Sequence, residues 1–151
     1  MSALPKLAKL RIKTRLAVTD HNAVKEIAAQ TQLSISECIE NMVLLVKGIY
    51  EQDETEAIIY TLRKLKYEPL ANAESLRQMP ATYICHVTLH PSVLEFAEFL
   101  RSTYPPVFKT PNEAIALCAH YCCRFWHNAK HQHYLCSRLL EIKKRRRERA
   151  L

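Results

Sequence analysis

Glycine is nearly missing from this chain of 151 residues, in which Gly48 is the single example. Phosphate-binding loops of the Gly-x-Gly-x-x-Gly and P-loop kinds are therefore excluded. Tight hairpins that need glycine are equally scarce, which argues against a fold of many strands. Most of the chain instead shows the spacing of apolar residues that is typical of helices.

Long apolar runs are missing as well. A run such as Met42–Val46 is far too short to cross a bilayer, which takes roughly 20 residues, and the N-terminus does not read as a signal peptide. The six cysteines include no Cys-x-x-Cys pair, so without a secretory signal we expect reduced thiols. These features predict a cytoplasmic protein with no membrane association.

Acidic residues are scarce at both ends of the chain. Residues 1–16 hold five Lys or Arg and no acid, and residues 138–151 hold seven Lys or Arg against two acids. Since the net charge of the whole chain is +7, the segment between the ends is mildly acidic. Basic ends of this kind suit a polyanionic partner, although many such tails are simply solvated.

Residues 10–18 alternate between apolar and basic side chains. One face holds Leu10, Ile12, Thr14, Leu16 and Val18, and the other holds Arg11, Lys13, Arg15 and Ala17. This period of two predicts a strand that is buried on one side. Three cations on the exposed side repel one another unless an anion covers them, although such charges also protect an edge strand from aggregation.

Two helices are expected after this strand. Asp20 offers an N-cap for the first, and the capping box Ser34–Glu37 opens the second, which we expect to end near Gly48. A strand and two helices of this length cannot bury their apolar faces alone. The unit therefore needs a partner.

The strand and the segment Ala28–Val43 together resemble the ribbon-helix-helix superfamily, the MetJ/Arc class of repressors. The resemblance implies a two-stranded ribbon in the major groove and a phosphate at the start of the second helix. Both are physically reasonable, because a two-stranded ribbon fits the major groove and a capped helix N-terminus favours a bound anion. It implies base readers at Arg11, Lys13 and Arg15, and a phosphate anchor formed by Ser34 with the amides of Ile35 and Ser36. The chain departs from the family at Gln32, where glycine usually makes a left-handed turn.

The same order of strand, helix, cap and helix recurs downstream. One face of the second strand holds Tyr83, Cys85, Val87 and Leu89, and the other holds Thr82, Ile84, His86 and Thr88. Thr110–Glu113 is a second capping box with Pro111 at the first helical position. This unit adds His86, Thr88, Thr110 and Asn112 to the expected DNA contacts, while Ile84 offers only a methyl contact.

We therefore expect a mainly α fold with a two-stranded antiparallel β-ribbon, built from two tandem ribbon-helix-helix units. The expected divisions are 1–50 (first unit), 51–81 (connecting helix Glu51–Lys66 and linker), 82–126 (second unit) and 127–151 (C-terminal basic helix or tail). This plan is similar to that of the TraY type of relaxosome protein. The two strands could pair within one chain or with those of a second copy.

The C-terminal region raises two further questions. We expect its cations either to contact DNA phosphates or to form a surface for a partner, and they are Lys143, Lys144, Arg145, Arg146 and Arg147. The Cys and His residues between Cys118 and Cys136 suggest a metal site, but the apolar spacing favours core positions for Cys38, Cys85, Cys118 and Cys122. We expect no metal or cofactor, and the absence of catalytic motifs predicts that the protein is not an enzyme.

The sequence thus predicts a sequence-specific protein for double-stranded DNA, acting as a transcriptional repressor or as an accessory in a plasmid relaxosome or partition complex. Its expected partners are DNA, a second copy in a homodimer, and a relaxase or a toxin. The alternative is a protein-interaction module, an antitoxin or effector-complex subunit, which uses the strands for dimerisation.

Overall fold

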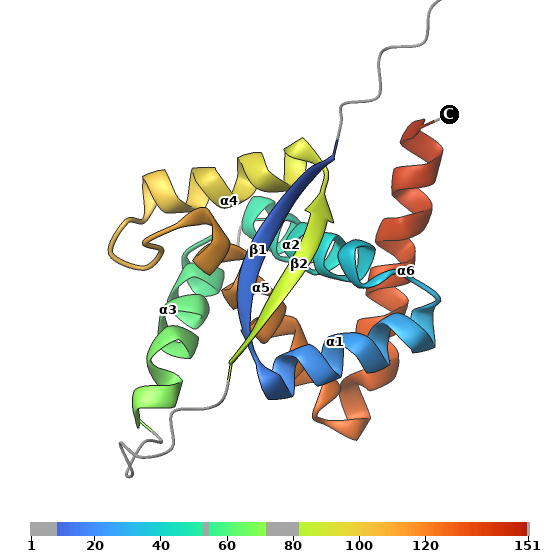
Figure 1. The fold of residues 1–151 in the computed structure, drawn as a ribbon, viewed down its shortest axis with the longest axis horizontal. Coiled ribbons are helices and arrows are strands. Elements are labelled where there is room, and N and C mark those ends of the chain that lie inside the picture. The colour runs from blue at the N-terminus through green and yellow to red at the C-terminus, as the bar shows by residue number, and fades with distance from the viewer. Residues whose placement is uncertain (1–8, 53–54, 72–81, 151) are drawn as a thin grey trace, which may run out of the picture.

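A computed structural model describes residues 9–52, 55–71 and 82–150 of the chain. Across these ranges a strand and three helices are followed by a second strand and three more helices (Figure 1). The first half contains β1 (Leu10–Ala17), α1 (Val18–Thr31), α2 (Ile35–Glu51) and α3 (Thr55–Ala71). The second half contains β2 (Thr82–Leu89), α4 (Pro91–Thr103), α5 (Pro111–Trp126) and α6 (Ala129–Ala150). The expected class, mainly helical with one two-stranded antiparallel ribbon, is confirmed.

The two strands pair with each other in antiparallel order, although three helices separate them in the chain. The register runs from Leu10 opposite Leu89 to Ala17 opposite Thr82. The buried positions of the ribbon are Thr14, Leu16, Cys85, Val87 and Leu89. Pairing within one chain gives each half the partner that its apolar faces require.

The ends of the ribbon differ from the alternation expected at these positions. Leu10 and Tyr83 were expected on the buried face, but they lie at opposite ends of the ribbon and are 51% and 48% exposed. Val18 is not the last residue of the strand, because it already begins α1 and is exposed. Tyr83 lies outside the core and stacks instead on His21 of α1, with the ring centroids 3.9 Å apart.

The ribbon lies across α2 and α5, with the remaining helices around them (Figure 1). Buried side chains from all eight elements form one continuous hydrophobic core, in which Leu16, Ile39 and Ile115 are almost completely enclosed. All four expected divisions of the chain contribute to this core. The ribbon therefore has a fixed, buried inner face and an outer face turned to solvent.

Side-chain caps open four of the described helices, and at α6 Asn128 Oδ1 accepts from the Lys130 amide at 3.1 Å. At α2, Ser34 Oγ accepts from the Glu37 amide at 3.1 Å and the Glu37 carboxylate accepts from the Ser34 amide at 3.5 Å, so the first capping box is confirmed. At α5, Thr110 Oγ1 accepts from the Glu113 amide at 3.1 Å. His90 caps α4 through Nδ1, which accepts from the Ser92 amide at 3.1 Å. An imidazole cap was not expected from the sequence.

The expected N-cap at Asp20 is wrong. Helix α1 follows β1 directly, with Ala17 at the cap position and no side-chain cap, so Asp20 falls inside the first turn. Its side chain is buried, and its Oδ2 lies 2.7 Å from His120 Nδ1 on α5. Asp20 therefore contacts a side chain 100 positions away in the sequence instead of capping its own helix.

The helix ends around the connection also differ from expectation. Helix α2 continues through Gly48 and ends at Glu51. The space around Gly48 is open, because a Cβ at this glycine would meet no other side chain within 4 Å. Helix α3 spans Thr55–Ala71 rather than Glu51–Lys66, and the rest of the expected linker, residues 72–81, lies outside the described residues. The two expected helices here, α2 and α3, are present with shifted bounds.

The turn between α1 and α2 keeps a left-handed residue without glycine. Gln32 has φ 57° and ψ 33°, and it is the only non-glycine residue with positive φ among the described positions. Its amide donates to Ala28 O, as does the amide of Leu33 at 3.0 Å. The turn is thus closed by hydrogen bonds in spite of the steric cost that a Cβ carries in this conformation.

Replacing Gln32 by glycine should raise the free energy of unfolding by about 1 kcal/mol, because the left-handed conformation no longer strains a side chain. Gln30→Gly is the matched control, since Gln30 is exposed within α1, and it should lower stability by about 1 kcal/mol. Urea unfolding of both variants measures these changes. Equal destabilisation by the two glycines would refute the strained turn.

Candidate nucleic-acid interface

Besides the half-buried Ala17 and its partner Thr82, the outer face of the ribbon carries six exposed side chains in three cross-strand pairs. The pairs are Arg11 with Thr88, Lys13 with His86, and Arg15 with Ile84. All three cations stand in one row along β1, as the alternation of the sequence predicted. The second row holds an apolar side chain, an imidazole and a hydroxyl, and its Ile84 is 49% exposed.

The two outer edges of the ribbon are covered by the first turns of helices α2 and α5. On the β2 edge, the Thr88 amide donates to Ser36 Oγ at 3.0 Å. On the β1 edge, Asn112 Nδ2 donates to Lys13 O at 2.8 Å, and Thr14 Oγ1 donates to Asn112 O at 3.1 Å. Ser36 and Asn112 occupy the same position in their helices, two residues after the cap. Both were expected to contact DNA, and both hold the ribbon.

These contacts place a helix N-terminus beside each edge of the ribbon. The first amides of a helix have no partner inside the helix, and with the helix dipole they favour a bound anion. At α2 the exposed Ser34 and the half-buried Ile35 and Ser36 form this end. At α5 the exposed Thr110 precedes Pro111, which has no amide hydrogen to offer.

A buried carboxylate connects α2 with both ends of the chain. Glu40 is completely buried, and its Oε2 accepts from the His90 amide at 2.5 Å. Its Oε1 lies 3.3 Å from Lys9 Nζ and 3.4 Å from Arg146 Nη2. Arg146 also donates to Asn41 Oδ1 at 2.9 Å. The only sequence signal for this cluster is a pair of polar residues inside the apolar segment of α2.

The cluster fixes the basic end of α6 beside the first turns of α2 (Figure 1). The expected run of DNA-contacting cations is therefore not uniform. Arg146 is engaged with Glu40, Arg145 pairs with Glu141 at 2.5 Å, and Lys143 is half-buried. Lys144 and Arg147 are exposed.

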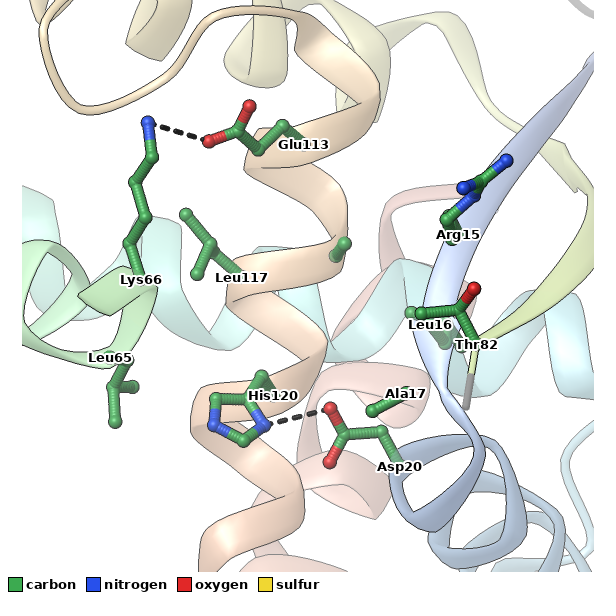
Figure 2. Close-up of a pocket in the computed structure, with 11 residues that line it drawn as sticks. Arg15, Leu16, Ala17, Asp20, Leu65, Lys66, Thr82, Glu113, Leu117 and His120 are labelled. Carbon is green, nitrogen blue, oxygen red and sulfur yellow. Dashed lines mark hydrogen bonds and ion pairs between the residues drawn. The ribbon is translucent and has the colours of Figure 1, made fainter. Parts of the chain in front are cut away.

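A cavity of about 400 Å³ lies beside the end of β1, between α3 and α5 (Figure 2). Two polar contacts cross its lining, a hydrogen bond between Asp20 and His120 and an ion pair between Lys66 and Glu113 at 2.8 Å. Figure 2 shows the Arg15 guanidinium directed away from the Asp20–His120 pair. The two contacts join α1 and α3 to α5, next to the end of β1.

The cysteines are free thiols, and five of the six are buried. Burial is the main cause that raises the pKa of Cys38 and of Cys118 to about 12, so both thiols stay protonated. The core placement expected for Cys38, Cys85, Cys118 and Cys122 is confirmed. In the described ranges, no three His, Cys, Asp or Glu side chains are grouped to hold a metal ion.

None of the described helices combines the length and the apolar character needed to cross a membrane. No protein-family model, curated protein or solved structure matches the chain.

Arg146→Ala should lower the free energy of unfolding by about 1–3 kcal/mol, because Glu40 loses a charged partner in a fully buried position. Arg147→Ala, the exposed neighbour, should change it by less than about 0.5 kcal/mol. Chemical denaturation of the two variants makes the comparison. Similar values for both would show that the end of α6 is not docked on α2.

Proposed function

We propose that this protein binds double-stranded DNA in a sequence-specific manner by placing the β1–β2 ribbon in the major groove. The observation that carries the proposal is the row formed by Arg11, Lys13 and Arg15 on the outer face of a ribbon closed within one chain. A two-stranded ribbon fits the major groove, and Arg or Lys there can donate to guanine O6 and N7.

Edge protection is the other explanation for three cations on a strand. It fits the arrangement less well, because both edges of the ribbon are already covered. Asn112 occupies the β1 edge at Lys13 and Thr14, and Ser36 occupies the β2 edge at Thr88. The cations also point from the face of the ribbon rather than from its edge, which is the geometry for reading bases.

The flanking helices supply the second part of a DNA contact. With the ribbon in the groove, the N-termini of α2 and α5 lie on its two sides, where the two phosphate backbones border the groove. The phosphate contacts we propose are Ser34 with the amides of Ile35 and Ser36, and Thr110 with the amide of Asn112. Such contacts fix position on the duplex and carry no sequence information.

The class we propose is a tandem ribbon-helix-helix protein. Its support is the order strand, helix, capped helix in both halves, as β1-α1-α2 and as β2-α4-α5. The role we propose is that of a repressor, or of an accessory in a plasmid relaxosome or partition complex that works beside a relaxase. If no duplex binds and a partner protein co-purifies instead, the chain is an interaction module such as an antitoxin.

Single replacement of Arg11, Lys13 or Arg15 by alanine should weaken binding to the preferred duplex by about 1–3 kcal/mol each. The fold should persist, because all three side chains are exposed. Lys130→Ala, an exposed lysine at the opposite end of α6 from the basic tail, is the control and should bind like the parent. Fluorescence anisotropy measures the affinities, and unchanged binding by the triple alanine variant would refute the ribbon interface.

Replacing the exposed tail cations Lys144, Arg145, Arg147 and Arg149 by alanine should weaken binding to all duplexes alike. Because each phosphate contact contributes about −0.9 to the slope of log K against log salt, the slope should flatten by as much as roughly 3 to 4. Arg146 is left in place so that α6 stays docked. A full salt slope in this variant would mean that the tail serves some other surface.

A further inference from the structure

The outer face of the ribbon is chemically different on its two strands. Lys13 and His86 form the middle of the three outward pairs in which both side chains are exposed, and exchanging the strands about this pair relates Arg11 to Ile84 and Arg15 to Thr88. In none of these three exchanges does a side chain replace another of the same type. The two ends of the ribbon differ as well, because one presents Arg15 beside Ile84 and the other presents Arg11 beside Thr88.

The phosphate-binding ends proposed for α2 and α5 are also unequal. Both first-turn residues of α2, Ile35 and Ser36, carry amide hydrogens, whereas α5 begins with Pro111. Only the α2 side lies beside the docked basic end of α6, through the contact of Arg146 with Glu40. The asymmetry of the ribbon therefore extends to both of its flanks.

We propose that one chain reads one asymmetric duplex site, with guanines contacted along the β1 row and a thymine methyl contacted by Ile84 at one end only. This inference rests on the proposed function. It follows from the closure of the ribbon within a single chain, since no second copy is needed to complete the reading surface. A two-fold symmetric protein selects a site with matching symmetry, and this ribbon has no such symmetry to match.

The chemistry of each row gives the site its direction. Arg and Lys side chains donate to guanine acceptors, while an apolar side chain in the major groove favours the methyl group of thymine. Ile84 is half exposed and stands opposite Arg15, so the thymine belongs at the Arg15 end of the site. Thr88, beside Arg11, has a smaller apolar surface than Ile84. Its hydroxyl can form hydrogen bonds with several different bases, so it selects none of them strongly.

Selection from a random duplex pool by the full-length protein tests the inference. The enriched site should not equal its own reverse complement, and analytical ultracentrifugation on a short duplex with one site should show one chain bound. An enriched palindrome occupied by two chains would overturn the inference while leaving the proposed function standing. If no duplex is enriched at low salt, the proposed function fails, and the inference fails with it.

A swap of the two β-branched residues, Ile84→Thr together with Thr88→Ile, tests the direction of the site. The composition and strand propensity of the ribbon stay the same, so the variant should fold like the parent. Its thymine preference should move from the Arg15 end to the Arg11 end, by roughly fourfold if one buried methylene is gained or lost. A thymine preference that does not move would overturn the assignment of Ile84.

Discussion

The pairing of β1 with β2 is the interaction on which the rest of this structure depends. Each strand with its helices exposes an apolar face that it cannot cover alone, and the pairing of Leu10 through Ala17 with Leu89 through Thr82 joins the two faces into one core. The pairing closes a long loop, the chain between β1 and β2. The entropy that such a closure costs grows only slowly with the length of the loop. The buried inner face of the ribbon offsets that cost, and the same pairing sets six side chains together on the outer face.

Polar contacts stabilise the ribbon in addition to the apolar core. A two-stranded ribbon leaves backbone groups unpaired on both outer edges, and from the first turns of α2 and α5 Ser36 and Asn112 satisfy two of them, the Thr88 amide and the Lys13 carbonyl. The arrangement that stabilises the ribbon therefore also positions two helix N-termini beside it. Glu40 connects α2 with Lys9 and Arg146, which lie near the two ends of the chain. These two cations and the His90 amide compensate the cost of burying its carboxylate.

Local chemistry made much of this fold predictable from the sequence. Alternation located both strands and their outward residues, and the residues that follow Ser34 and Thr110 identified the starts of α2 and α5. Long-range contacts were not predictable, because no local pattern specifies a partner that is about 100 positions away, as His120 is from Asp20 or Arg146 from Glu40. Those contacts explain the wrong cap at Asp20 and the unequal roles of the tail cations. The function proposed for the outer face, and its relation to ribbon-helix-helix proteins, remain predictions.

The central claim is that the outer face of the ribbon reads the major groove, and methylation interference tests it most directly. Dimethyl sulfate methylates guanine at N7 in the major groove and adenine at N3 in the minor groove. The account predicts that N7 methylation at a few clustered guanines blocks binding, that N3 methylation does not, and that Lys13→Ala removes the block at one of these guanines. Binding that tolerates N7 methylation throughout the site, or that is blocked through N3 alone, would contradict it.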